Sequence, residues 1–326
     1  MKAFNSDDIK NEILSGDEKR IALALRRARD FDFDADRFYA SVLEICNFLE
    51  HKNKKLYSLP GLKAEIDAYG LRLNNMNLKS IPDYFSAFCD LTDRIDISNN
   101  AFSEFPTVLL EFKQLKQLNL SNNNLTKLPE SIGNFTMLES LDISANLFVK
   151  LPAMLAQIDP LKSLTVNCSN TLYFQHALPK YLEKLSLNFS KTISFPEAIY
   201  TCTSLKTIEL EGISELPEGI KNFEKLEMLC IRRAGLFTLP DSISDIKNLK
   251  KLSLCNLLLL NKIPDVVFKL QNLEALDLSG SPLLELPAKL RQLRNLKSIN
   301  LNGCSDDITL GHWKKRCESW GIEILV

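Results

Sequence analysis

Cysteine and histidine are the side chains of this chain that could ligate a metal or pair as nucleophile and base. No two of the eight cysteines form a Cys-x-x-Cys pair, and the three histidines are far apart. Zinc sites and Cys–His catalytic pairs need more favourable spacing. We therefore expect no metal, no cofactor and no catalytic residue. The simplest interpretation is free thiols in a reducing compartment. The cysteines are residues 46, 89, 168, 202, 230, 255, 304 and 317, and the histidines are residues 51, 176 and 312.

Other motifs and the charge balance narrow the function further. The sequence has no Gly-rich phosphate loop followed by Lys, no Gly-x-Ser-x-Gly elbow and no His-Glu-x-x-His helix, which predicts a protein that is not an enzyme. A net charge of −1 gives no general attraction to nucleic acid or to an anionic membrane. The sequence lacks an 18-residue apolar run and an apolar N-terminal leader. We expect a cytoplasmic monomer, with secretion without an N-terminal signal peptide as the alternative.

One group of charged and sulfur-containing side chains favours binding over chemistry. Two acids, one arginine, a thioether and two thiols lie between residues 209 and 255. Two isolated acids, Asp142 and Asp277, are added to this group of candidates. Such a mixture is more typical of a binding spot than of a solvated face; ordinary surface variation is the alternative interpretation. Whether these side chains meet depends on the elements that carry them. The candidate partner-binding residues are Glu209, Glu211, Met228, Cys230, Arg232, Cys255, Asp142 and Asp277.

The elements are predicted by an internal repeat with a period of about 23 residues. Each copy has two aliphatic residues separated by one residue, then a turn, then usually an aliphatic-Pro step. Side chains alternate across a strand, so the two aliphatics face the interior and the residue between them faces outward. One copy cannot bury its own apolar faces, so the copies must stack as a solenoid. The pairs are at 71/73, 95/97, 118/120, 141/143, 164/166, 185/187, 208/210, 229/231, 252/254, 276/278 and 299/301.

This pattern resembles the leucine-rich repeat family in its bacterial-type, 23-residue version. The clearest copy carries the Leu-Pro step and the later aliphatic, as Leu128-Pro129-Glu130-Ser131-Ile132. The resemblance covers about residues 60–305. It implies an α/β solenoid, a horseshoe with a parallel concave β-sheet of about twelve strands. It also implies a function, because members of the family usually bind proteins.

A solenoid must cover its terminal coils, and both ends of the chain predict caps. Residues 1–69 read as a helical N-terminal cap, with an N-cap at Ser6, a second N-cap at Asp17 and an apolar stripe from Phe38 to Leu49. A separate partner-binding module is the alternative. Residues 70–305 form the repeats. Residues 306–326 read as a capping helix, with Trp313 and Trp320 in its core, and a twelfth strand at 322–324, 23 residues after Ile299.

The copies are uneven. Asn100, Asn123 and Asn146 follow the second aliphatic by three residues, where the family's Asn hydrogen-bonds neighbouring backbone. Ile213 and Ala234 cannot donate that bond, whereas Ser and Cys can replace Asn at the other positions, Ser169, Ser190, Ser281 and Cys304. We expect local irregularity over residues 205–262, either as harmless drift or as a kink that shapes a site. The run 257–260 is four leucines, of which at least one is expected to be exposed.

The function predicted from the sequence is a non-catalytic scaffold that binds a protein partner on the concave face, possibly centred on residues 205–262. One alternative is a secreted or injected bacterial effector without its own catalytic domain. Another is a purely structural rod, which a featureless outward face would favour.

Overall fold

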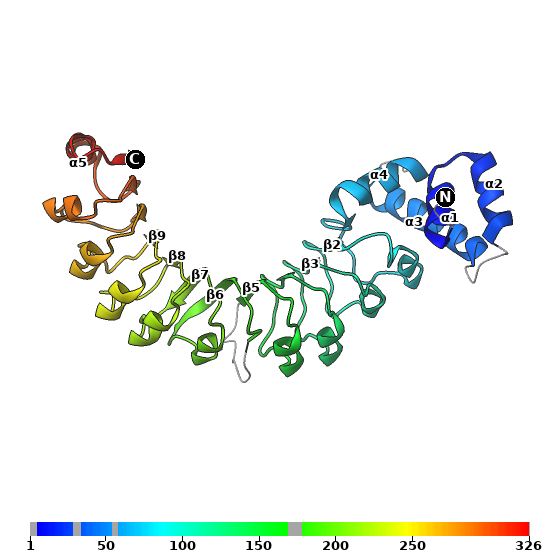
Figure 1. Ribbon diagram of the computed structural model, residues 1–326, viewed down its shortest axis with the longest axis horizontal. Helices are drawn as coiled ribbons and strands as arrows, with labels where there is room; N and C mark the ends of the chain where they lie inside the picture. The colour runs from blue at the N-terminus through cyan, green and yellow to red at the C-terminus, as the bar shows by residue number, and fades with distance from the viewer. Residues whose placement is uncertain (1–4, 29–33, 54–57, 169–177, 326) are drawn as a thin grey trace. The chain divides into compact units, whose positions relative to one another are not determined.

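The computed structural model describes residues 5–28, 34–53, 58–168 and 178–325 (Figure 1). Two predicted positions, Ser169 and His176, lie outside the described residues. The chain divides into two compact units. The first comprises residues 1–125 with 134–139, and the second comprises residues 126–133 with 140–326. The predicted boundaries at 69/70 and 305/306 stay predictions. The helices are α1 (Ser6–Leu14), α2 (Glu18–Arg27), α3 (Ala35–Asn53), α4 (Leu59–Tyr69) and α5 (Asp307–Ser319).

Twelve parallel strands follow one another in the sheet in the order of the sequence, which confirms the predicted solenoid. The first aliphatics of neighbouring copies pair in register, as in Leu229 with Leu252. Both aliphatics of a copy are buried, whereas the residue between them is less buried, as in Leu118, Asn119 and Leu120; Cys230, between Leu229 and Ile231, is the exception. The strands are β1 (Leu71–Arg72), β2 (Arg94–Asp96), β3 (Gln117–Asn119), β4 (Ser140–Asp142), β5 (Ser163–Cys168), β6 (Lys184–Ile193), β7 (Thr207–Ile213), β8 (Met228–Arg232), β9 (Lys251–Cys255), β10 (Ala275–Asp277), β11 (Ser298–Asn300) and β12 (Glu323–Leu325).

Short 3-10 helices follow the aliphatic-Pro steps. Proline fixes its own φ and is favoured directly before such a turn. Pro240, for example, precedes η8 (Asp241–Asp245), and its carbonyl oxygen accepts from the Ile243 N–H at 3.2 Å. Ile243 is fully buried, so the later aliphatic of each copy fills the interior. In the second unit these 3-10 helices line the side opposite β5–β9 (Figure 1).

The helices of the first unit form the predicted N-terminal cap. The N-cap of α1 is Asn5 rather than the predicted Ser6: the Asn5 side chain accepts from the N–H groups of Asp7 and Asp8, and Asp8 accepts back from the Asn5 N–H. This reciprocal pairing satisfies more helix-terminal donors than a serine one residue later would. The Asp17 N-cap of α2 is confirmed by a 3.0 Å bond from the Arg20 N–H. The apolar stripe of α3, from Phe38 to Leu49, is buried.

At the C-terminal end, α5 packs against β12 and buries Trp313 and Cys317. The twelfth strand exists, but its predicted register is wrong by two residues. Ile299 pairs with Ile324, not with Ile322. The physical reason is that a whole helix replaces the short 3-10 turn in this last coil, which lengthens it. Because the shift is even, inward and outward faces are unchanged.

A left-handed backbone position recurs two residues after the second aliphatic. The residues there have φ between 45° and 78°. Asn and Gly tolerate this conformation, whereas a residue such as Ala or Arg is strained in it. Cys168 and Phe189 are in strands instead: β5 ends at Cys168, and β6 continues to Ile193. The register between β6 and β7 shifts between Asn188 and Ile193, opposite Glu211 and Ile213, so the irregularity begins in the copy before the predicted span of 205–262. The position is occupied by Asn75, Asn99, Asn122, Ala145, Gly212, Arg233, Asn256, Gly280 and Gly303.

The predicted asparagine ladder is present. The Asn123 side-chain N–H donates to the carbonyl oxygens of Ile97 and Leu120 at 3.1 and 3.0 Å, and its side-chain oxygen accepts from the Phe102 N–H at 3.2 Å. Ser281 and Cys304 replace it as predicted, each donating to a carbonyl oxygen of the preceding copy, Leu254 and Leu278. The ladder therefore satisfies interior backbone groups that have no strand partner.

Replacing Asn123 by Ala is expected to destabilise the first unit by about 2–4 kcal/mol, because buried backbone groups lose their partners at about 1–3 kcal/mol each. Urea unfolding of the full chain measures the change. Asn124→Ala is the control, because Asn124 is exposed and its loss is expected to cost less than about 0.5 kcal/mol. Equal costs for the two variants would mean that the ladder is not what holds this turn.

An alternating charge ladder lies two residues before the first aliphatic of each copy from 95/97 to 299/301. Acids and lysines alternate without a break. Lys206 pairs with Glu183, Lys250 with Glu227 and Lys297 with Glu274, at 2.6–2.9 Å. A hydrogen bond from Lys250 lowers the pKa of Glu227, and the same bond raises the pKa of Lys250. The ladder residues are Asp93, Lys116, Glu139, Lys162, Glu183, Lys206, Glu227, Lys250, Glu274 and Lys297.

Glu227→Gln is expected to lower the unfolding midpoint at neutral pH. A carboxylate with a lowered folded-state pKa stabilises the fold above its unfolded pKa of about 4.3 and loses that contribution as the pH falls through the lower folded value. The difference between the variant and the unsubstituted chain should therefore vanish near pH 3, and shrink in 1 M salt, where charges are screened within about 3 Å. Thermal melts check this, with Glu224→Gln as the control. A difference that persists at low pH contradicts a charge origin.

Candidate functional site

The structure places seven of the eight candidate residues on four neighbouring strands. Glu209 and Glu211 are on β7, Met228, Cys230 and Arg232 are on β8, Cys255 is on β9 and Asp277 is on β10. The register sets Glu209 beside Cys230, Glu211 beside Arg232, and Arg232 beside Cys255. Asp142 is on β4, three strands before β7, and does not join this group.

The outward side chains of β8–β12 surround a shallow hollow of about 370 Å³, here called the sheet-face hollow. Five of the candidate residues line it, and Lys251 and Leu325 are among the lining residues that were not selected. Lys251 comes one residue before the first aliphatic of its copy, the position that Met228 occupies on the neighbouring strand. Leu325 reaches the hollow because of the register shift of β12. The predicted residues in its lining are Met228, Cys230, Arg232, Cys255 and Asp277.

The acids of β7 are held by neighbouring cations. Glu209 forms an ion pair with Lys184 at 3.0 Å, and one Arg232 nitrogen lies 3.9 Å from its other oxygen. Glu211 pairs with Arg233 at 3.1 Å and accepts from the Asn188 side chain at 2.9 Å. Both acids are about four-fifths buried, since their side chains are 19 % exposed. Glu209 and Glu211 therefore fix the positions of neighbouring side chains and present little negative charge to a partner.

The two thiols of the group are not exposed. Cys230 and Cys255 are only 5 % and 7 % exposed. Both belong to the seven cysteines for which the structure shows a free thiol. The Cys255 Sγ donates to the Asp277 carboxylate at 3.1 Å, and burial raises the pKa of Cys255. The thiol is therefore protonated at neutral pH and a poor nucleophile. Cys230 and Cys255 do not form a disulfide with each other.

Asp142 and Asp277 share a structural role that the sequence reasoning missed. One oxygen of each accepts from the N–H two residues later, at 2.9 Å from Ser144 and 3.0 Å from Ser279. Asp96, Asn119 and Asn300 do the same at the ends of their strands. This is an Asx turn, which lets the chain leave the strand. The signal was available in the recurrence of Asp or Asn between the aliphatics.

The turn edge beside these strands exposes several large apolar side chains. Within the run 257–260, Leu257 and Leu260 are buried while Leu258 and Leu259 are exposed, as predicted. Phe237 and Leu284 are also exposed, in the turns before and after that run. The turn of the copy 141/143 exposes Leu147 and Val149 in the same way, so this apolar edge is not confined to residues 205–262.

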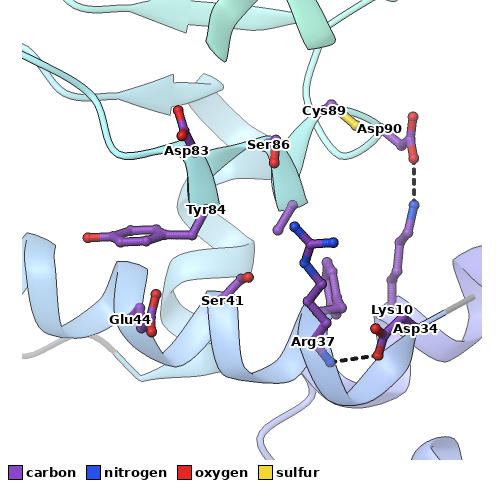
Figure 2. A pocket seen from close by; sticks show the side chains of 12 residues that line it. Lys10, Asp34, Arg37, Ser41, Glu44, Asp83, Tyr84, Ser86, Cys89 and Asp90 are labelled. Atoms are coloured by element: carbon purple, nitrogen blue, oxygen red, sulfur yellow. Dashed lines mark hydrogen bonds and ion pairs between the residues drawn. The ribbon is translucent and has the colours of Figure 1, made fainter.

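A second hollow, of about 480 Å³, lies in the first unit between α3 and η2 (Asp83–Phe88) (Figure 2). Lys10 Nζ donates to Asp90 at 2.7 Å across its rim, and the Asp34 side chain accepts from the Arg37 N–H at 2.9 Å (Figure 2). Four acids and two cations line it, and the Lys10–Asp90 ion pair neutralises part of this charge. The described residues that line it do not combine apolar and cationic surface to an extent comparable to the sheet-face hollow.

The described residues contain no metal centre and no membrane-spanning helix. No group of three or more His, Cys, Asp or Glu side chains in this part of the chain is arranged to hold an ion. None of the described helices is both long and apolar enough to cross a bilayer.

Comparison with known proteins agrees with the repeat architecture. The Leucine Rich Repeat family model matches residues 114–135, and no curated protein sequence matches the chain significantly. Among solved structures, the leucine-rich repeat domain of the type III effector XopL is 21 % identical, with 93 % of this chain and 97 % of that one covered, and a TM-score of 0.55.

Two further structures are similar. The complex of latrophilin 3, Unc5D and the repeats of FLRT2 matches at 20 % identity over 77 % of this chain and 88 % of that one, with a TM-score of 0.53. A leucine-rich repeat protein of Leptospira interrogans matches at 23 % identity over 82 % and 86 %, with a TM-score of 0.39. At these identities the likeness shows the fold alone. The twelve stacked strands, the asparagine ladder and the similarity to the XopL and FLRT2 repeats together identify the fold as a leucine-rich repeat solenoid with a helical N-terminal cap.

Proposed function

We propose that the chain is a non-catalytic scaffold that binds a protein partner on the sheet face of β7–β10. The observation that supports it most is the sheet-face hollow, because it combines apolar lining, exposed cations and fixed backbone in one place. A rigid, preformed surface loses little conformational entropy on binding. Leucine-rich repeat folds are typically non-catalytic, and the burial of the Cys230 and Cys255 side chains fits that interpretation.

The proposed compartment is cytoplasmic, supported by the free thiols of the described cysteines. The alternative function, a bacterial effector, is supported only by the similarity of this fold to that of XopL. A purely structural rod is less well supported, because a rod does not need a mixed surface confined to a few copies.

Affinity capture with the full chain from its native cells, read by mass spectrometry, tests this function. Met228→Asp places a charge in the lining of the hollow and should lose the partner that the unsubstituted chain retains. Met154→Asp is the matched control, because Met154 is similarly half-buried but lies on η5 (Ala153–Gln157), on the other side of the sheet. Equal capture by both folded variants would refute the proposed face.

A further inference from the structure

The charges around the sheet-face hollow are unequally available to a partner. Among the acids, Glu209 and Glu211 are held by Lys184 and Arg233. Asp277 accepts from the Ser279 N–H with one oxygen and from Cys255 with the other. Each carboxylate is thus already satisfied within the fold, and a cationic partner would have to displace these contacts.

The cations are more available. The Arg232 side chain is 48 % exposed, and its nearest acid, Glu209, is 3.9 Å away. Arg233 is 74 % exposed despite its ion pair with Glu211. Lys251 is exposed and forms no ion pair with a carboxylate in the described part of the chain. Because the Arg232 and Arg233 side chains remain 48 % and 74 % exposed, a partner carboxylate can bind them while Glu209 and Glu211 keep their contacts.

Arg233 also occupies a strained backbone position. Its φ is 45°, at the left-handed position that most other copies fill with Asn or Gly. A long, charged side chain there costs stability that Asn would avoid. Backbone strain of this kind clusters at functional sites. Ala145 has the same conformation in its own copy, so the strain supports a role for Arg233 only together with the exposure of its side chain.

An apolar contribution completes the site. Leu325 of β12 is 49 % exposed and lines the hollow, opposite the half-buried Met228 of β8. An exposed leucine beside a concave apolar lining can be covered by a single side chain of a ligand. The hollow is thus apolar along one part and cationic along another.

We propose that the partner segment that occupies this surface is acidic and inserts an apolar side chain into the sheet-face hollow. Its carboxylates contact Arg232, Arg233 and Lys251, and the apolar side chain packs on Met228. The segment continues across β9–β11 to cover Leu325 on β12. This inference rests on the proposed function and adds the chemistry of the partner. Electrostatic complementarity of this kind chiefly sets specificity and association rate.

A displayed library of random twelve-residue peptides, selected on the full chain, supplies the probe. Enriched peptides should carry Asp or Glu near an aliphatic or aromatic residue. A synthesised winner should bind the triple variant R232E/R233E/K251E at least roughly tenfold more weakly, and Arg291→Glu, on η10 (Ala288–Gln292), equally well. Replacing the peptide's acids by Lys should restore binding to the triple variant. If that variant does not fold, R232Q/R233N/K251Q makes the same comparison.

The outcomes separate this inference from the proposed function. Peptides that lose binding to Met228→Asp but ignore the charge variants would leave the face intact and overturn the acidic partner. Peptides that ignore both changes would overturn both. Arg233→Asn provides a further readout, because it should raise the unfolding midpoint while weakening the peptide. A variant that gains no stability or binds as well as the unsubstituted chain contradicts the role given to Arg233.

Discussion

Replacing Gly212 by Ala is expected to destabilise the second unit by roughly 3–5 kcal/mol, at the upper end of single substitutions. Gly212 has a φ of 78°, and a Cβ there would overlap the carbonyl oxygen of Phe189 on β6. That oxygen belongs to backbone and cannot rotate away. Either β6 or the end of β7 must move, and Glu211 moves with it. Urea unfolding of the full chain, followed by circular dichroism, measures the loss.

Gly303→Ala is the matched control for this substitution. Gly303 occupies the same position of its copy with a φ of 70°, but a Cβ there would meet nothing closer than 3.8 Å. It should lose only the left-handed strain, about 1–2 kcal/mol. Equal losses at the two glycines would show that the close approach of β6 and β7 does not constrain the fold.

Arg232→Glu is expected to weaken binding of the natural partner at least tenfold, which corresponds to about 1.4 kcal/mol. The change removes an exposed cation beside the hollow and adds a third acid to Glu209 and Glu211. A partner selected for the cationic surface would then meet repulsion. Titration by calorimetry, at two salt concentrations, measures the change and its electrostatic part.

The control for this binding experiment is Arg291→Glu, which makes the same charge change on η10, away from the sheet face. Circular dichroism establishes that both variants are folded. If Arg232→Glu binds as tightly as Arg291→Glu, the sheet face near β8 is not where the partner binds.

The sequence predicted the fold because its strongest signals are local. Two buried aliphatics per copy, kept in phase over many copies, require parallel stacked strands, and the order β1–β12 confirms this. Caps were predicted for a similar reason, since Asp17 and the stripe from Phe38 to Leu49 act within single helices. The errors at Ser6 and at the register of β12 arise where a neighbouring residue or a longer turn competes with the local pattern.

The candidate site was only partly predictable, because it depends on which residues of neighbouring copies pair across the sheet and on how deeply each side chain is buried. Lys251 and Leu325 line the hollow through register, which no single copy reveals. Cys230 and Cys255 were placed on the correct strands, but both side chains are buried, which their positions in the sequence do not reveal. The strain at Arg233 is visible only when the left-handed position is aligned across copies.

The most direct test of the sheet-face claim is acylation footprinting of the full chain with and without its captured partner. Lys251 lines the sheet-face hollow and is exposed in the free chain, whereas Lys221 is exposed on η7 (Glu218–Asn222). The partner is expected to slow modification of Lys251 severalfold and to leave modification of Lys221 unchanged. Protection of Lys221 with no change at Lys251 would contradict binding at the sheet face.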